Sequence, residues 1–245
     1  MVLKQCWNGL KAMIDLSVII PSYLEEENLR ILIPRIQVIL NKININYEIL
    51  IIDTIEPTDN TKIAVDTLGA FYINREGGNS YGDAVRTGIK KAKGNHILFM
   101  DADGSHSPET ILELLKYGND FDVVIASRYI EGGGSDNSKT LILMSLIVNS
   151  IYAFVLGIKV KDVSNSFKLY DSKILKELKL KCNNFDIVEE ILVKIYHRNK
   201  NLRIKEIPYL FKERMFGRTK RHIVSFIFSY IVTLFKLRLF FTTEK

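Results

Sequence analysis

Two carboxylates, Asp101 and Asp103, follow directly on an apolar run at residues 96–100. Side chains two positions apart in an extended chain lie on the same face, so an extended chain here would direct both carboxylates and the hydroxyl of Ser105 towards one point. Mg²⁺ is usually held by one or two carboxylates, with substrate phosphates and water completing its shell. The spacing therefore predicts a site for a metal-bound diphosphate. The alternative is a turn whose acids only cap the next helix.

The elements that must position these acids alternate along the first half of the chain. Continuous apolar runs predict strands that are covered on both faces, and segments with helical periodicity lie between them. This alternation predicts an α/β fold with a mostly parallel sheet and helices on both faces. Ligands bind such sheets at the carboxyl ends of strands, where Asp53 and Asp101 both stand. The predicted strands are residues 16–21, 47–53, 96–100 and 121–127, and the predicted helices are residues 25–41, 59–68, 81–93 and 108–117, the last with Ser107 as N-cap.

Charge and cysteine content narrow the partners and the compartment. The chain carries 34 Lys and Arg against 28 Asp and Glu, a net charge of +6 that favours anionic partners. These basic residues do not cluster in one stripe, so nucleic acid is not an expected partner. Two cysteines, Cys6 and Cys182, are too few for a disulfide framework. Lys4 and Lys11 interrupt the apolar residues that a secretory signal would need, so we expect a cytoplasmic location.

Five segments stand out in order along the chain: SVIIPSYLEEENL (17–29), FMDADGSHSPE (99–109), ASRYIEGGG (126–134), DVSNSFKLY (162–170) and EIPYLFKERMFGRTK (206–220). Together they resemble the family-2 glycosyltransferases of GT-A fold, and most of all the branch that acts on dolichyl or polyprenyl phosphate as a mannosyltransferase. The resemblance extends from about residue 15 to about residue 220. It implies a Rossmann-like sheet and a Mg²⁺ or Mn²⁺ ion, and it favours the metal site over the capping turn for the paired acids.

The same resemblance implies a nucleotide-sugar site, the donor site. Its base and ribose would be held by Pro21, Tyr23 and Glu25, with Asp53 as a further nucleotide-binding acid. Its diphosphate and metal would be held by Asp101, Ala102 and Asp103, with Ser105 completing the metal shell. Arg128 matches an arginine of the donor site, and Arg214 and Lys220 match the basic pair of a loop that closes over the donor and acceptor phosphates.

One departure from the family pattern affects the donor site. The sequence DTIEPTDNT stands where DDGSPDGT is usual, so that Thr54 replaces the second Asp and one residue is inserted. The base of the nucleotide is therefore left open.

The acceptor decides whether the reaction needs a general base. A hydroxyl acceptor must lose its proton to a positioned carboxylate, whereas a lipid monophosphate, with a second pKa of about 6, is already mostly ionised. Glu190 aligns with an acid of the family, with Glu189 as a rival, although both are also typical of the acidic first turn of a helix. The acceptor phosphate is expected near Ser164, Ser166 and Lys168, the last standing where the family usually has Arg.

The resemblance implies a metal-dependent, inverting transfer of a hexose, with mannose from GDP-mannose as the expected donor, to dolichyl or another polyprenyl phosphate. The first alternative is the same fold with UDP-glucose or another donor and a saccharide hydroxyl as acceptor. The second is a nucleotide-sugar-binding subunit without turnover, which the altered residues around Thr54 would allow.

Two uncharged segments, residues 140–158 and 223–235, stand out in the second half of the chain. Ser145, Asn149 and Tyr152 recur at helical spacing in the first of them, and basic residues flank both segments. Helices with a polar stripe and basic ends lie in the membrane interface and are attracted to anionic lipid. The alternatives are ordinary core helices, or a membrane span at residues 140–158.

These features predict three parts of the chain. Residues 1–14 form an N-terminal extension, residues 15–220 form the GT-A domain with an amphipathic interface helix at 139–158, and residues 221–245 form a second amphipathic interface helix. Within the GT-A domain, the glycine-rich stretch at 129–139 is the best candidate for a breakpoint, because three consecutive glycines give the backbone freedom. The end of the chain resembles the mannosyltransferase catalytic subunit without membrane spans of its own. We therefore expect peripheral binding to the cytoplasmic face of a membrane, with a small membrane-anchoring subunit as a further partner.

Overall fold

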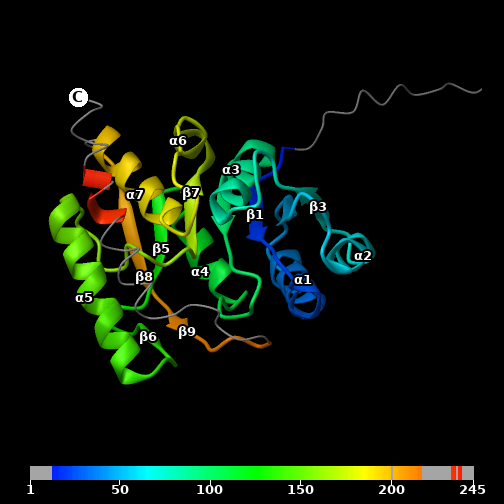
Figure 1. Cartoon of the computed structure of the whole chain (residues 1–245), viewed down its shortest axis with the longest axis horizontal. Helices are drawn as coiled ribbons and strands as arrows, with labels where there is room; N and C mark the ends of the chain where they lie inside the picture. Colours follow the sequence, from blue (N-terminus) through cyan, green and yellow to red (C-terminus); the bar gives the residue numbers. More distant parts are fainter. Residues whose placement is uncertain (1–12, 200, 217–232, 236, 239–245) are drawn as a thin grey trace, which may run out of the picture.

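The computed structural model describes residues 13–199, 201–216, 233–235, 237 and 238. A sheet of seven strands, in the order β3-β2-β1-β4-β7-β5-β8, runs through the centre of this structure (Figure 1). β7 is antiparallel to its neighbours β4 and β5, and the other pairs of this sheet are parallel. The strands are β1 (Leu16–Pro21), β2 (Tyr47–Asp53), β3 (Phe71–Asn74), β4 (His96–Phe99), β5 (Val123–Ser127), β7 (Lys168–Asp171) and β8 (Ile204–Pro208).

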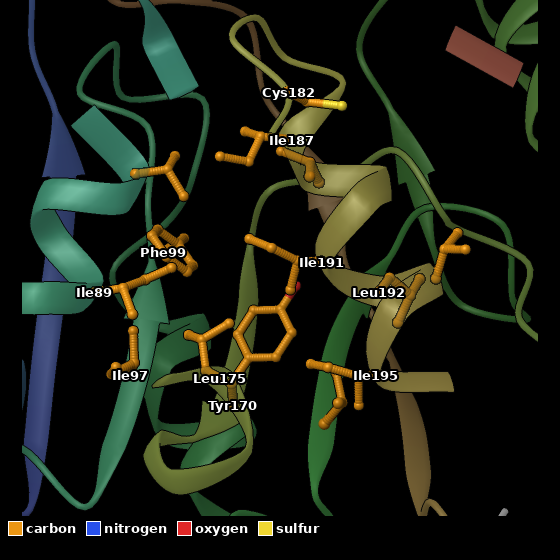
Figure 2. Close-up of a cluster of buried hydrophobic side chains, with 14 of the residues drawn as sticks. Ile89, Ile97, Phe99, Tyr170, Leu175, Cys182, Ile187, Ile191, Leu192 and Ile195 are labelled. Carbon is orange, nitrogen blue, oxygen red and sulfur yellow. The ribbon is translucent and has the colours of Figure 1, made fainter. Parts of the chain in front are cut away.

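Helices cover both faces of the sheet. The helices are α1 (Glu26–Asn41), α2 (Thr61–Thr67), α3 (Tyr81–Lys91), α4 (Thr110–Lys116), α5 (Lys139–Leu156), α6 (Ser172–Lys176) and α7 (Ile187–Arg198). Residues of α1, α2 and α4 belong to one buried apolar cluster, and residues of α3, α5, α6 and α7 belong to another. Figure 2 shows part of the second cluster, where Phe99 of β4 and Tyr170 of β7 meet Ile191 of α7.

Strand β1 shows why the apolar runs form a doubly covered sheet. Val18 and Ile20 lie in the cluster under α1, whereas Ile19 between them lies in the cluster under α3. Successive side chains of a strand point to opposite faces, so a strand with helices on both sides must be apolar at every position. The predicted α/β fold with a mostly parallel sheet is confirmed.

The topological switch point lies between β1 and β4. From β1 the order proceeds through β2 to β3 in one direction, and β4 adds on the other side of β1. The connections that follow β1 and β4 therefore diverge, and in open α/β sheets the carboxyl ends of the strands at such a point are where a ligand crevice is expected. Residues 21–25 and 101–106 border it, so the topology places the first two motif segments together.

Some boundaries differ from those predicted. β3 was not predicted, because it is an edge strand whose end residues are exposed and which lacks a continuous apolar run. α4 begins at Thr110, two residues later than predicted, because residues 108–109 form a turn. The glycine-rich stretch is paired as well: β6 (Gly134–Ser135) lies parallel to β9 (Leu210–Phe211). This pairing joins the stretch to the chain that leads to Arg214.

Helix α5 runs along one side of the structure (Figure 1). Its polar side faces the protein and its apolar side faces outward, the reverse of a helix on a soluble surface. Its polar residues Asn149 and Tyr152 are buried against the protein, whereas Ile147 is 50% exposed and Phe154 is 89% exposed. The predicted polar stripe exists, but it does not face solvent. Among the described residues, α5 is the one helix long and apolar enough to cross a membrane by length and composition, a property that many core helices share.

The terminal segments are described only in part. Residues 1–12 of the predicted N-terminal extension, and Cys6 with them, lie outside the described residues. Of the predicted helix at 221–245, residues 233–235, 237 and 238 are described, and all are helical. Leu237 is fully buried in the cluster that contains α5 and α7, and Arg238 donates to the Val155 carbonyl (3.1 Å). This piece of the C-terminal segment therefore packs beside α5.

Candidate functional site

The paired acids lie in a turn. Beyond Phe99 the chain leaves the strand and turns at residues 102–104, with Gly104 at φ +79°. The positive φ favours glycine here, and a Cβ atom on Gly104 would come within 2.5 Å of the Met215 side chain, which would have to shift. The chain is therefore not extended beyond Met100, as the alignment of the three oxygens would require. The loop after β9, which contains Met215, packs directly over the turn.

Asp103 is the most constrained acid of the turn, and it is 5% exposed. Ser105 donates its backbone N–H (3.0 Å) and its hydroxyl (2.6 Å) to Oδ1. Arg214 forms an ion pair with Oδ2 through Nε (2.9 Å), and the Met215 N–H donates to the Asp103 carbonyl (2.9 Å). The turn thus holds the carboxylate in one orientation and brings a cation to it.

Asp101 is held from two other directions. Ser166 donates its hydroxyl to Oδ1 of Asp101 (3.0 Å), and the Asp101 backbone N–H donates to Nδ1 of His106 (3.0 Å). The predicted metal acid and a predicted acceptor-site serine, 65 residues apart in sequence, are therefore direct neighbours.

His106 is a structural residue that the sequence did not identify. It is fully buried, and its ring stacks on Phe167 with 4.6 Å between centroids. Burial lowers the pKa of His106, so the ring is neutral, with Nδ1 as acceptor. A single histidine in a loop gives no signal that could have revealed this role, which is to fix the backbone at Asp101.

The segment after β1 borders the same crevice. Pro21 ends β1 and is buried, whereas Tyr23 is half exposed. Glu25 accepts from the Asn28 amide (2.5 Å). Burial raises the pKa of Glu25, and the negative charges of Asp103 and Asp101 raise it further. The charges of the paired acids therefore act on Glu25, and its place in one donor site with them stays a prediction.

Asp53 lies at the end of β2 and is fully buried. Tyr72 donates its hydroxyl to Oδ2 (3.0 Å), while Oδ1 has no hydrogen-bond partner among the described residues. Burial raises the pKa of this carboxyl. The unusual Thr54 turns back and donates to the Glu56 carbonyl (2.6 Å). Binding of a nucleotide by Asp53 stays a prediction.

Arg128 faces the loop at residues 162–166. Its Nε and Nη2 each lie 2.8 Å from an oxygen of the buried Asp162, and Nη2 also donates to the Ser164 hydroxyl (3.0 Å). Since Ser166 of the same loop reaches Asp101, this loop connects the predicted donor arginine, the predicted acceptor serines and the paired acids. We call residues 162–166 the bridging loop.

Lys168 lies beneath the bridging loop and has no exposed surface. Its ammonium donates to the Val163 carbonyl (3.0 Å) and to the Asn165 carbonyl. Burial lowers the pKa of Lys168 to about 8. In this arrangement the side chain supports the loop backbone, and binding of an acceptor phosphate by Lys168 stays a prediction.

Glu190 is fully buried in α7. It accepts from the backbone N–H groups of Lys181 and Cys182 (2.8–3.0 Å) and forms an ion pair with Lys194 (2.9 Å). These contacts stabilise the chain that precedes α7. They give Glu190 a structural role, and its use as a general base stays a prediction.

Replacing Glu190 with Gln is expected to lower the free energy of unfolding by about 3 kcal/mol, because it removes the carboxylate that forms an ion pair with the buried Lys194. Urea denaturation followed by circular dichroism measures this loss. Glu177→Gln, at an exposed acid, is the control and should change little. Unchanged stability together with a tenfold loss of activity would instead identify Glu190 as a site residue.

The donor set of the turn fits a hard divalent cation. Carboxylate and hydroxyl oxygens are the ligands that Mg²⁺ and Mn²⁺ prefer, and a guanidinium already lies on Asp103. The described part of the chain contains no group of three or more His, Cys, Asp or Glu residues able to hold a metal. Asp101 and Asp103 would thus supply two protein ligands, and phosphate and water the others. Lys220 lies outside the described residues.

Comparison with known proteins identifies relatives that cover most of the chain. The family model of glycosyl transferase family 2 matches residues 17–179. A dolichol-phosphate mannosyltransferase of Pyrococcus furiosus is 33% identical over 229 residues, which cover 90% of this chain and 63% of that protein. A polyprenol monophosphomannose synthase of Mycolicibacterium smegmatis is 28% identical over 221 residues, covering 83% and 79%. The chain thus spans less than two thirds of the Pyrococcus protein.

Solved structures agree with the sequence relatives on the fold. The glucosyl-3-phosphoglycerate synthase of Mycobacterium tuberculosis, solved with Mn²⁺, UDP and phosphoglyceric acid, has a TM-score of 0.70 at 17% identity, covering 93% of this chain and 80% of that one. The same enzyme has also been solved with Mg²⁺ and UDP. The GT-A fold predicted from the sequence is confirmed. The matching family model, the relatives and this fold together show that the chain belongs to glycosyl transferase family 2.

Proposed function

We propose that this protein transfers mannose, with inversion, from GDP-mannose to a polyprenyl phosphate at the cytoplasmic surface of a membrane. The relatives named for mannosyl transfer to dolichol or polyprenol phosphate support this substrate pair. The observation that carries the proposal is the hydrogen bond between Ser166 and Asp101. It joins the predicted metal site of the donor to the predicted phosphate site of the acceptor, as a direct displacement requires.

On the donor side, Asp101 and Asp103 would hold a Mg²⁺ or Mn²⁺ ion. Such an ion, when bound, acts as a Lewis acid and neutralises charge on the departing diphosphate. Arg214 lies beside Asp103 and is partly exposed, so its guanidinium can turn to the diphosphate and add fixed positive charge. The free Oδ1 of Asp53 can accept an N–H of the base, and Tyr23 can cover the base.

On the acceptor side, the chemistry needs no strong base. The lipid phosphate is mostly ionised at neutral pH, so its oxygen can attack the anomeric carbon directly as the bond to the diphosphate breaks. Arg128 and the hydroxyls of Ser164 and Ser166 border the acceptor side and would orient this phosphate. The buried position of Glu190 in an ion pair agrees with a reaction that uses no general base there.

A transfer assay with several nucleotide-sugar donors tests the proposal against its alternatives. Radiolabelled GDP-mannose, UDP-glucose and other nucleotide-sugars are each incubated with the protein, Mn²⁺ and polyprenyl phosphate, and label is counted in the organic phase. We expect label from GDP-mannose. Label from UDP-glucose alone would contradict GDP-mannose as the donor and support the alternative donor, which the altered residues around Thr54 allow. Donor binding without release of GDP or UDP would support a subunit without turnover.

Membrane binding is the second part of the proposal. α5 exposes an apolar face that includes Ile147, Ile151 and Phe154, a surface that would be buried favourably in the acyl boundary of a bilayer. A small membrane-anchoring subunit stays a prediction.

The double variant Ile147→Glu, Phe154→Glu is expected to bind acidic liposomes at least about tenfold more weakly, because each buried side chain contributes about 1.5–3 kcal/mol. Cosedimentation measures the partition. Ile63→Glu, at an exposed residue of α2, is the matched control and should bind as the wild type does. Equal binding of the double variant would show that α5 is not the membrane face.

A further inference from the structure

Asn149 is a buried polar residue on a helix whose outer face is apolar. It is 1% exposed. A buried amide is costly unless all its hydrogen-bonding groups are satisfied, and here they are. Oδ1 accepts from the N–H groups of Val163 (2.8 Å) and Ser164 (3.0 Å), while Nδ2 donates to the Ser145 carbonyl (2.9 Å) and the Ser164 hydroxyl (3.1 Å).

Three of these four bonds go to the bridging loop. Asn149 therefore ties the backbone and a side chain of that loop to α5, 14 to 15 residues earlier in the chain. The Ser164 hydroxyl that it holds also accepts from Arg128, and Ser166, two residues further on, donates to Asp101. The loop has no regular secondary structure between residues 162 and 167, so side-chain bonds such as these determine its conformation.

We propose that Asn149 is a positioning residue of the acceptor site: it holds the bridging loop so that Ser164 and Ser166 meet the acceptor phosphate while Ser166 keeps Asp101 oriented. The inference rests on the proposed function for its acceptor. Its structural part, the placement of the loop and of Asp101, does not depend on that function. Sequence spacing identified Asn149 only as part of a polar stripe.

Two substitutions separate positioning from mere stability. Asn149→Ala removes all four bonds. Asn149→Asp keeps oxygens that accept from the Val163 and Ser164 N–H groups, and the Ser164 hydroxyl can rotate to donate to the new carboxylate. Ser150→Ala, at the exposed neighbour on α5, is the control. If Asn149→Ala does not fold, Asn149→Ser, whose shorter side chain does not reach both N–H groups, takes its place.

The experiment measures kcat, the KM for donor and acceptor, the Mn²⁺ affinity by electron paramagnetic resonance with GDP present, and hydrogen exchange at Val163 and Ser164. For Asn149→Ala we expect the acceptor KM to rise at least about tenfold, since small misplacements of binding groups have large effects. The donor KM, measured at saturating Mn²⁺, should change less than about threefold, the two amides should exchange faster, and Mn²⁺ should bind more weakly. Asn149→Asp should recover the part of each effect that depends on the Val163 and Ser164 N–H groups, but it cannot replace the bond to the Ser145 carbonyl, because a carboxylate has no donor.

The result that would overturn the inference is a variant that loses protection at the two amides while its acceptor KM and Mn²⁺ affinity stay at wild-type values. A failure of the proposed function would look different. The wild type itself would then transfer nothing to polyprenyl phosphate, and the Mn²⁺ affinity and amide exchange of the variants would still decide whether Asn149 positions the loop and Asp101.

Discussion

Asp103→Asn is expected to abolish Mn²⁺ binding and to slow sugar transfer by at least about a thousandfold. The carboxylate is held by both donors of Ser105 and by Arg214, so the amide would occupy nearly the same place and the fold should persist. It would lack the negative charge that attracts a divalent cation, and one of its two ends would donate where the site requires an acceptor. Mn²⁺ titration with GDP present and radiolabelled transfer measure the two effects.

The control for this substitution is Asp120→Asn, which removes the same charge at an exposed acid. It should leave metal affinity and transfer unchanged. Asp103→Asn protein that is folded, as judged by circular dichroism, and that still transfers sugar in the presence of EDTA would contradict the metal site and the mechanism built on it.

Arg214→Ala is expected to lower kcat about a hundredfold while Mn²⁺ binds at least as tightly as in the wild type. The loss of rate follows from losing a positive group beside the departing diphosphate. The metal affinity is maintained because the guanidinium lies on Oδ2 of Asp103 (2.9 Å), where it and a cation would compete for one oxygen. Arg214→Lys should recover part of the rate, because Lys keeps the charge but loses the planar fork.

Arg30→Ala is the matched control for Arg214→Ala, since Arg30 forms an exposed ion pair with Glu26 on α1, and such pairs contribute little. Single-turnover kinetics separate the chemical step from product release. If Arg214→Ala weakened Mn²⁺ binding as strongly as Asp103→Asn does, Arg214 would be a support for the carboxylate and would not act on the diphosphate.

The paired acids show how far local pattern predicts a site. A buried strand followed by two carboxylates placed Asp101 at the crevice between β1 and β4, because strand ends and sheet topology follow from apolar runs. The turn itself was not predictable. It depends on Met215 packing against Gly104 and on His106 accepting from Asp101, and the first of these contacts comes from more than 100 residues away in the chain.

Two charged residues show what the local sequence does not predict. Lys168 and Glu190 were predicted as site residues from the family resemblance, and charged side chains are usually exposed. Both are fully buried, the first under the bridging loop and the second in an ion pair with Lys194. Burial of a charge depends on what the rest of the chain provides around it, and the sequence of the segment alone does not contain that information.

Helix α5 shows that spacing and orientation are separate questions. The helical repeat of Ser145, Asn149 and Tyr152 correctly predicted a helix with one polar side. Periodicity does not say which side faces the protein. The bonds of Asn149 to the bridging loop decide this, because polar groups in the loop require partners inside the fold.

Because the apolar side of α5 faces outward, residues on that side can be replaced to make the protein easier to handle in solution. Its outward side chains, such as Leu143, Ile147 and Phe154, make no hydrogen bonds to the bridging loop, so they can be exchanged for lysine or glutamate without disturbing it. Such a redesigned chain should remain monodisperse at high concentration without detergent. It would provide material for crystallisation with nucleotide, while the natural side chains are kept for work in bilayers.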